Sequence, residues 1–452
     1  MLNCFITESS ASIIPLNLVL QTEYAAWLAK QDPFIKHWLD STGFRNDAGS
    51  VAMIPNATGQ LSTVICCVKA MTDFWSVGSL PFLLPSGCYR LNVTDSQFAI
   101  AWGLGSYQYT RYKKSLKKPA QLLVESDLDY VTNIVESIYL VRDLINTPTD
   151  DMGPSELADA AVALAKPFNA VVKQIVGEDL LKENYASIYT VGRACDDAPR
   201  LIDLRWGDKK HPKVTLVGKG VCFDTGGLNI KVAGGMTLMK KDMGGAAHVL
   251  GLARMIMEAK LPIQLRVLIP AVENSVSGNA YRPGDVITSR KGLTIEVGNT
   301  DAEGRVVLAD ALTEAASENP ELLIDIATLT GAARVALGTE LPAMFTNDEK
   351  LAADITAYGV QEQDPVWRLP LFALYRDALN SSIADINNNT ADGYAGAITA
   401  ALFLKEFVPN EMSWVHFDLM AWNVKARPGR PQGGEAMGVR GLFSYLNARY
   451  KK

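Results

Sequence analysis

The sequence is poor in the residues that usually build zinc sites and disulfide frameworks. Its four histidines lie far apart along the chain, so no pair has the spacing of a zinc motif. The six cysteines include no CxxC pair and are too sparse for a disulfide scaffold, which predicts reduced thiols. These residues are His37, His211, His248 and His416, and Cys4, Cys66, Cys67, Cys88, Cys195 and Cys222. A metal site in this chain would therefore depend on carboxylates.

Long apolar runs and a basic excess are also lacking. No apolar run reaches the roughly 18 residues that a membrane span needs. The first residues, Met1-Leu2-Asn3-Cys4-Phe5, lack the basic start of a signal peptide. The 43 basic and 49 acidic residues give a formal net charge of −6, which disfavours a nucleic-acid-binding protein. We expect a cytoplasmic protein that binds neither membranes nor nucleic acids.

The composition is that of a globular protein with more than one core. Of the 452 residues, 48% are hydrophobic and 20% are charged. A chain of this length exceeds one ordinary core, so two domains are expected. We predict a smaller N-terminal α/β domain over residues 1–122, a linker helix over 123–146, and a larger C-terminal domain over 147–452.

The predicted N-terminal domain contains short β-like runs, such as Leu61–Val68, and ends in a basic segment, Arg111–Pro119. We interpret this segment as a solvated helix end and linker, with an anion-binding surface as the alternative. Apolar residues at helical spacing over residues 126–145 then predict a helix that stops near Asn146-Thr147-Pro148.

Beyond this helix, strand-like and helix-like segments alternate. The alternation predicts an α/β fold with a mostly parallel sheet that helices cover on both faces. The predicted strands are Ser187–Val191, Val214–Val217, Leu265–Ile269, Leu322–Ile326 and Trp414–Leu419, and the predicted helices are Gly244–Ala259, Arg305–Ala316, Ile398–Phe407 and Met437–Leu446. In such sheets ligands bind beyond the carboxyl ends of the strands, so a site is expected in the loops that follow strands.

The segment Asn299-Thr300-Asp301-Ala302-Glu303-Gly304-Arg305 carries two carboxylates two positions apart and a guanidinium two positions further on. A solvated helix face would space its charges three or four apart. Small residues between the acids let the backbone approach a neighbour closely. Asp301 and Glu303 suit a hard divalent cation, and Arg305 suits an anion or a developing oxyanion.

Two further segments bring carboxylates into glycine-rich settings. The predicted strand at 214–217 runs into Gly218-Lys219-Gly220, and Asp224 follows with two glycines close behind. This loop matches neither the dinucleotide nor the P-loop pattern. Lys231 comes next, and Asp242 stands at the start of a helix, where it could also be merely the N-cap.

The convergence of these segments predicts a metal centre. Four carboxylates in one cleft would repel one another strongly unless cations lay among them. Two divalent ions that share bridging oxygens fit four carboxylates better than one ion, and such pairs serve hydrolysis of carbonyl or phosphoryl groups. Lys231 and Arg305 would supply positive charge where an oxyanion develops.

These motifs resemble, in order and spacing, those of the leucyl aminopeptidase (cytosol aminopeptidase) family. The resemblance rests on Gly218-Lys219-Gly220, Phe223–Gly227, Lys231, Asp242–Ala247, Asn299–Arg305 and Ala327–Ala332. It runs from about Asn146 to near the C-terminus and is weak over residues 1–120.

The resemblance implies that residues 147–452 form a catalytic domain with a dinuclear metal site. Lys219, Asp224, Asp242 and Glu303 would hold the tighter metal, and Asp224, Asp301 and Glu303 the more exchangeable one. Asp224 and Glu303 would bridge the two metals, and the backbone carbonyl of Asp301 would help to bind them. Lys219 would have to be neutral, since an ammonium offers no lone pair. Manganese or zinc is expected first, with magnesium or cobalt as alternatives.

The implied activity is removal of the N-terminal residue from peptides. A metal-bridging water would attack the scissile carbonyl while Lys231 polarises it and the backbone near Leu329 positions the substrate. Arg305 would hold a bicarbonate ion that acts as the general base. Met239, Thr328 and Gly331 would line the pocket for the first side chain, and an apolar Met239 favours Leu or Met there. The family also implies a homohexamer, with an N-terminal domain that serves assembly and access.

The chain departs from better-known members at several positions. Lys240-Lys241 precede Asp242 where a single basic residue followed by Ala is usual, and Thr237 stands where Asp is common. His416 and Asp418 alternate on one predicted strand, so they could either reach the site or make structural hydrogen bonds. We interpret His248 as a packing residue and Cys222 as a small buried hydrophobe.

Two other functions stay open at this stage. Two-metal carboxylate sites also serve phosphoesterases, although the turn at Arg305 argues against this reading. A DNA-binding or regulatory protein that retains the fold is the second alternative. The basic residues at 113–118 are its only support, and the negative net charge opposes it.

Overall fold

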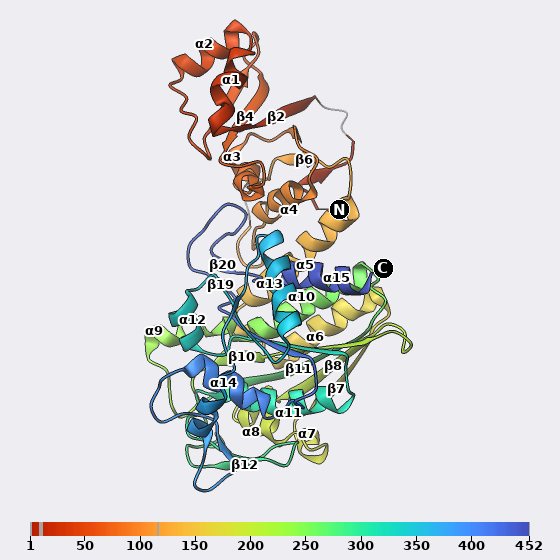
Figure 1. Ribbon diagram of the computed structural model, residues 1–452, viewed down its shortest axis with the longest axis vertical. Helices are drawn as coiled ribbons and strands as arrows, with labels where there is room; N and C mark the ends of the chain where they lie inside the picture. Colours follow the sequence, from red (N-terminus) through yellow and green to blue (C-terminus); the bar gives the residue numbers. More distant parts are fainter. Residues whose placement is uncertain (1, 9–11, 115–116, 452) are drawn as a thin grey trace. The chain divides into compact units, whose positions relative to one another are not determined.

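The computed structural model describes residues 2–8, 12–114 and 117–451, and the chain forms two compact units (Figure 1). One unit consists of Met1–Tyr139 and Lys425–Gln432, and the other of Leu140–Val424 and Gly433–Lys452. Each unit is built on its own sheet, which confirms the predicted α/β class with a smaller N-terminal domain and a larger C-terminal one. In the described parts of the chain, no helix is both long and apolar enough to span a bilayer.

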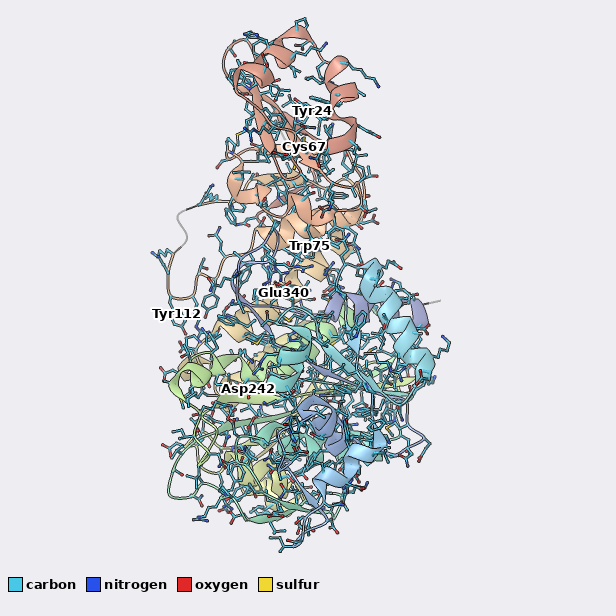
Figure 2. All side chains as sticks on the ribbon, turned by 60° about the vertical axis from the view of Figure 1, so that its left-hand side comes forward. Tyr24, Cys67, Trp75, Tyr112, Asp242 and Glu340 are labelled. Atoms are coloured by element: carbon cyan, nitrogen blue, oxygen red, sulfur yellow. The ribbon has the colours of Figure 1, made fainter. Side chains whose placement is uncertain are left out.

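The N-terminal unit contains a six-stranded sheet in the order β1-β6-β5-β2-β4-β3. All neighbours in it pair in parallel except β3 and β4. Its elements are β1 Phe5–Ile6, β2 Ile13–Leu20, α1 Tyr24–Ala29, α2 Pro33–Ser41, β3 Val51–Pro55, β4 Leu61–Val68, α3 Leu80–Leu83, β5 Cys88–Leu91, α4 Ser96–Gly105 and β6 Gln121–Leu123. A small core of Val19, Leu39 and Ile65 packs against Tyr24, which Figure 2 labels. The β-like run predicted at Leu61–Val68 is confirmed as β4.

The prediction of a helix end at Arg111–Pro119 is wrong. Helix α4 ends at Gly105, and residues 106–114 and 117–120 are not helical. Ser115 and Leu116 lie outside the described residues, as does Met1. The helix predicted over residues 126–145 is present as α5, Leu128–Asn146.

The C-terminal unit is built on a nine-stranded sheet in the order β16-β15-β18-β14-β9-β11-β8-β7, with β10 paired to β11. Strands β18, β14, β9, β11 and β10 are parallel, whereas β8, β7 and β15 join antiparallel. The bounds are β7 Val171–Val176, β8 Arg200–Trp206, β9 Lys213–Gly218, β10 Gly220–Asp224, β11 Gln264–Asn274, β14 Leu322–Ala327, β15 Ala343–Thr346, β16 Trp367–Arg368 and β18 Trp414–Asp418. The parallel centre is the predicted arrangement, because these strands are buried apolar runs joined by helices.

Helices cover both faces of this sheet (Figure 1). α10 and α6 pack on one face and α11 and α8 on the other, while α15 lies over α10 and α14 over α11. The helices are α6 Pro154–Ala165, α7 Asp179–Lys182, α8 Ala186–Gly192, α9 Ala233–Met236, α10 Gly244–Glu258, α11 Glu303–Ser317, α12 Gly331–Leu337, α13 Glu349–Gln361, α14 Gly396–Lys405 and α15 Val439–Tyr450. Two small sheets complete the unit, with strands β12 Val286–Thr288, β13 Thr294–Glu296, β17 Ile386–Asn387, β19 Trp422–Asn423 and β20 Gly433–Gly434.

One predicted strand is a helix. Residues Ser187–Val191 lie in α8 and pack against α11. The carboxylate of Asp310, on α11, accepts hydrogen bonds from the backbone nitrogens of Ser187 (2.8 Å) and Ile188 (3.4 Å). These are amides at the start of a helix that have no partner within it. The stabilising group is more than a hundred residues away, so the local apolar pattern could not reveal it.

Candidate active site

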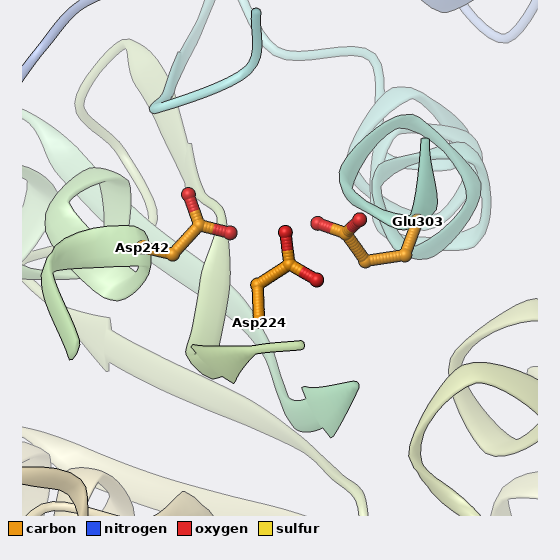
Figure 3. Close-up of side chains that lie close together, drawn as sticks. All are labelled: Asp224, Asp242 and Glu303. Atoms are coloured by element: carbon orange, nitrogen blue, oxygen red, sulfur yellow. The ribbon is translucent and has the colours of Figure 1, made fainter. Parts of the chain in front are cut away.

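Three buried carboxylates meet at the carboxyl ends of the central strands. Asp224 is the last residue of β10, Asp242 lies in the short 3-10 helix Met239–Met243, and Glu303 opens α11. Figure 3 shows their carboxylates pointing toward one another. One oxygen from each lies within 4.8 Å of the other two. Asp301 stands two residues before Glu303 and its side chain is one-third exposed.

Lys219, between β9 and β10, inserts its ammonium into this cluster. Its Nζ lies 2.7 Å from Asp242 Oδ2 and 3.0 Å from Glu303 Oε1, and donates to the carbonyl of Thr328 at 3.2 Å. Burial opposes a charged lysine, but the carboxylates of Asp242 and Glu303 outweigh it and raise the pKa of Lys219. In this arrangement the ammonium of Lys219 neutralises part of the charge of the cluster.

Lys231 is the second cation at the cluster. Its Nζ lies 2.7 Å from Asp224 Oδ2 and also contacts Asp301 Oδ1. The lysine thus links the most buried part of the cluster to its exposed edge. The carboxylates of Asp224, Asp242, Asp301 and Glu303 thus lie against the ammonium groups of Lys219 and Lys231, and Lys241 is next to Asp242 in the chain.

The titration of the carboxylates reflects their burial and their mutual repulsion. Burial and the charge of Asp224 raise the pKa of Glu303 to about 8, and burial with Asp242 raises the pKa of Asp224 to about 6. Burial also opposes ionisation of Asp242, but the cations of Lys219 and Lys241 hold its pKa below the usual range. Glu303 Oε2 accepts no hydrogen bond in the described structure. Buried carboxylate oxygens that repel one another fit divalent cations.

Hydrogen bonds from neighbouring loops hold Asp224 and Asp242 in place. Asp224 Oδ1 accepts from Asn274 Nδ2 and from the backbone of Gly226, both at 2.8 Å. Asp242 Oδ1 accepts from Thr328 Oγ1, also at 2.8 Å. The side chain of Asp242 makes no helix-capping hydrogen bond, so the N-cap alternative is wrong.

A second set of polar groups shapes the turn before Glu303. Asn388 Nδ2 donates to the carbonyls of Asn299 (2.8 Å) and Ala302 (3.3 Å). Tyr281 donates to the carbonyl of Thr300 at 2.7 Å. Sequence reasoning missed Asn274, Asn388 and Tyr281. Only Asn274 carried a signal, as a polar residue at the carboxyl end of a buried strand.

Arg305 lies just inside α11, with its side chain buried. Its Nη1 donates to the carbonyl of Asn388 at 2.8 Å, whereas its Nε has no hydrogen-bond partner in the described residues. Burial lowers the pKa of Arg305 to about 10. A buried guanidinium with a free N–H fits a small anion such as bicarbonate.

A cavity of about 340 Å³ opens onto the cluster. It is lined by Lys219, Asp224, Lys231, Asp242, Asp301 and Glu303, and by Met239, Thr328, Leu329 and Gly331, which were all singled out from the sequence. Lys241, Thr330 and Arg334 also line it. A larger cavity, of about 660 Å³, lies beside β7 and β8, but its buried Arg266 is already paired with Asp203 and Glu314.

The remaining candidates have structural partners. His416 Nδ1 bonds Asp325 at 2.5 Å, and Asp418 accepts from the backbone nitrogens of Leu329 and Thr330. Both residues therefore make structural hydrogen bonds. His248 is buried, and both of its ring nitrogens form hydrogen bonds. Nδ1 bonds the carbonyl of Gly244, and Nε2 accepts from the backbone nitrogen of Met437, so its role in packing is confirmed.

Cys222 is fully buried, and burial raises the pKa of its thiol well above the usual value. This agrees with its interpretation as a small hydrophobe, since a thiol that stays protonated is a poor nucleophile.

Buried carboxylates that converge beyond the carboxyl ends of an α/β sheet fit the class of metal-dependent hydrolases. Comparison with known families narrows this class. The model described as "Cytosol aminopeptidase family, catalytic domain" matches residues 139–443, and that described as "M17 aminopeptidase, N-terminal domain" matches residues 14–125.

Curated relatives and solved structures indicate the same family. The chain is 44% identical over 322 residues to a probable cytosol aminopeptidase of Legionella pneumophila (strain Paris), which covers 69% of this chain and 66% of that protein. It is 42% identical over 339 residues to a peptidase B of Pectobacterium atrosepticum, which covers 73% and 78%. A crystal structure of a cytosol aminopeptidase from Coxiella burnetii matches with a TM-score of 0.96 and 52% identity over 99% of this chain and 100% of that one.

The bottromycin maturation enzyme BotP, solved in complex with Mn, matches with a TM-score of 0.87 and 31% identity over 97% of this chain and 100% of that one. The chain therefore belongs to the M17 cytosol (leucyl) aminopeptidase family and is a metallo-exopeptidase of the leucyl aminopeptidase type.

Proposed function

We propose that this protein hydrolyses the N-terminal residue from peptides at a site that holds two divalent cations. The observation that carries the proposal is the cluster of Asp224, Asp242 and Glu303, whose oxygens approach within 4.8 Å around the ammonium of Lys219. Like charges at this spacing are tolerated in a buried site only with cations among them. Family membership and the manganese complex of BotP support the same assignment.

We assign Lys219, Asp224, Asp242 and Glu303 to one cation, and Asp224, Asp301 and Glu303 to the other. Asp224 and Glu303 would bind both cations, and the backbone carbonyl of Asp301 would help to bind them. When bound, the cations would supply a nucleophilic water and polarise the scissile carbonyl. We expect manganese or zinc, and the complex of BotP with Mn supports manganese. Magnesium and cobalt are the alternatives. For Lys219 to become a ligand its ammonium must lose a proton.

Lys231 is assigned to the scissile carbonyl. It lies beside the carboxylates on the cavity wall, so its ammonium can donate to an oxygen that gains negative charge in the transition state. The backbone at Leu329 positions the substrate next to it. Arg305 holds a bicarbonate ion, which would supply the general base, and the unpartnered Nε of Arg305 supports this role.

Met239, Thr328 and Gly331 line the pocket for the first side chain. The apolar side chain of Met239 supports the use of Leu and Met residues at that position. We further propose that the protein works in the cytoplasm as a homohexamer, in which the N-terminal domain serves assembly and access.

The test uses the purified 452-residue chain with Mn²⁺ and leucine p-nitroanilide. We expect hydrolysis that Glu303→Ala abolishes, because this change removes a carboxylate assigned to both cations. The N-acetylated substrate should not be cleaved, since the free α-amine is required for binding. No release above the Glu303→Ala background would refute the proposal, and so would equal cleavage of the acetylated substrate.

A further inference from the structure

Both carboxylate oxygens of Asp418 bind one short segment of the chain. Asp418 is the last residue of β18 and is 2% exposed. Its Oδ1 accepts from the backbone nitrogens of Leu329 (2.9 Å) and Thr330 (3.1 Å), and its Oδ2 accepts from the Thr330 hydroxyl at 2.6 Å. A buried carboxylate is costly unless it is hydrogen-bonded, and here all three hydrogen bonds come from two consecutive residues.

The central sheet places Asp418 beside this segment. Strands β14 and β18 are parallel neighbours, and Ala327, the last residue of β14, pairs with Asp418. The backbone nitrogen of Leu419 then donates to the carbonyl of Ala327 at 3.0 Å. The residues that follow β14 therefore leave the sheet next to the carboxylate of Asp418.

The hydrogen bonds of Asp418 fix the direction of two successive peptide planes. In a trans peptide the C=O of one residue points opposite to the N–H of the next, and none of the described peptide bonds is cis. Because Asp418 holds the N–H of Leu329, the carbonyl of Thr328 points away from Asp418. This carbonyl accepts from Nζ of Lys219 at 3.2 Å.

The carbonyl of Leu329 is an acceptor without a partner. It also points away from Asp418, since Asp418 holds the N–H of Thr330. Leu329 lines the cavity that opens onto the carboxylate cluster, and no backbone donor among the described residues bonds its carbonyl oxygen. A peptide substrate offers N–H groups on both sides of its first carbonyl, so an acceptor that is already oriented can bind one of them.

We propose that Asp418 is a positioning residue of the active site, which turns the carbonyl of Thr328 onto Lys219 and that of Leu329 toward the substrate. This inference rests on the proposed aminopeptidase function. Lys219 can bind a cation only through a lone pair on Nζ, and the hydrogen bond to Thr328 directs one of its N–H groups elsewhere. Loss of such a partner of a metal ligand typically weakens metal binding 10–100-fold.

The experiment compares two variants that change Asp418 in opposite ways. Asp418→Asn keeps the length of the side chain and an oxygen for both backbone nitrogens, but it removes the charge. Asp418→Glu keeps the charge, but its extra methylene displaces the peptide planes. We expect Asp418→Glu to weaken Mn²⁺ binding in calorimetry by at least about tenfold and to raise KM for leucine p-nitroanilide by about tenfold. Asp418→Asn should stay within about threefold of the unmodified protein in both measurements.

The matched control is Asp325→Glu, which adds the same methylene to a buried aspartate on the neighbouring strand. The carboxylate of Asp325 bonds Nδ1 of His416 and Nε1 of Trp414 rather than the segment after β14. Overpacking should lower the melting temperature of both glutamate variants. Only Asp418→Glu should lose Mn²⁺ affinity and raise KM, whereas the control should stay within about threefold.

Equal Mn²⁺ affinity in the two glutamate variants would overturn the inference, because general destabilisation would then explain the effect. An Asp418→Asn variant as impaired as Asp418→Glu would also overturn it, because charge rather than orientation would then matter. Where Asp418→Glu does not fold, Asp418→Ala adds no bulk and is compared with Asp325→Ala for the same losses. If the unmodified protein cleaves no substrate above the Glu303→Ala background, the aminopeptidase proposal fails, whereas the Mn²⁺ affinities still test the role of Asp418.

Discussion

Gly304 is the position where the smallest change should disturb the site most. It follows Glu303 in α11, and a Cβ there would lie 2.6 Å from Cε and 2.8 Å from Nζ of Lys219. Carbon atoms pack at about 3.5–4.0 Å, so Gly304→Ala must displace the lysine by about 1 Å. The ammonium cannot move freely, because Asp242, Glu303 and the carbonyl of Thr328 hold it.

We expect this displacement to lower kcat/KM for leucine p-nitroanilide about 100-fold, since a 1 Å misplacement of a catalytic group can cost that much. Overpacking should cost about 1–3 kcal/mol of unfolding free energy, offset by about 0.5–1 kcal/mol because alanine favours the helix. Metal content should fall as well, because Lys219 is assigned as a ligand. Steady-state kinetics with Mn²⁺, denaturant unfolding and elemental analysis measure the three effects.

The matched control is Gly234→Ala, in α9. Gly234 is also helical, but no atom lies within 4 Å of the position of its Cβ. Activity should stay within about threefold of the unmodified protein, and stability should be unchanged or higher by up to about 1 kcal/mol. If Gly304→Ala binds metal and turns over substrate as the control does, the position we assign to Lys219 is wrong.

Three further predictions concern stability. Removal of metal with EDTA should lower the melting temperature measured by calorimetry. Mn²⁺ at 100 times its Kd should then raise the free energy of unfolding by about 2.7 kcal/mol, and Glu303→Ala should abolish this gain. Burial lowers the pKa of His248 from 6.5 to about 4, so the folded state keeps this ring neutral while the unfolded chain protonates it. The contribution of His248 to the free energy of unfolding is therefore complete above about pH 6.5 and is lost as the pH falls toward 4. Urea titrations should show a loss of about 2 kcal/mol between pH 7 and 5, and His248→Gln should abolish this dependence on pH. Arg142 and Glu435 form a buried ion pair with two hydrogen bonds of 3.0 Å. Arg142→Met should lower the free energy of unfolding by about 3–5 kcal/mol, because it leaves the carboxylate of Glu435 buried without its partner. In a double-mutant cycle, the further change Glu435→Met should restore part of that loss.

The parallel centre of the catalytic unit could be predicted because its strands are short apolar runs with helical segments between them. Strand β14 and helix α10 agree with the sequence prediction to within a residue. The failure at Ser187–Val191 has a different cause. Five residues with apolar members fit a strand or a helix equally well, and the choice was made by Asp310, a distant carboxylate that accepts from the first amides of α8.

The carboxylates of the site could be predicted because each stands in a glycine-rich segment that follows a strand. The close approach that Gly304 permits was also foreseeable, although not its partner. Identifying Lys219 as that partner requires the fold, since these residues are far apart in the chain and meet only where β9 ends against α11. Asn274 donates to Asp224 and to the carbonyl of Thr300, whereas Asn388 and Tyr281 donate to loop carbonyls. Such isolated polar residues have no regular spacing that would single them out in a sequence.

The pair Lys240-Lys241 shows most clearly what the sequence could not decide. The two side chains are chemically identical and adjacent, yet a 3-10 helix turns about 120° per residue, so they point to different sides. Lys240 donates to the carbonyl of Asn146 and lies over the ring of Trp422, whereas Lys241 is 1% exposed and its Nζ makes no hydrogen bond in the described residues. Because Met239 and Asp242 are three residues apart, the same turn aligns a pocket residue with a carboxylate of the cluster. One five-residue helix thereby carries Asp242, which is assigned as a metal ligand, and Met239, which is assigned to the first side-chain pocket.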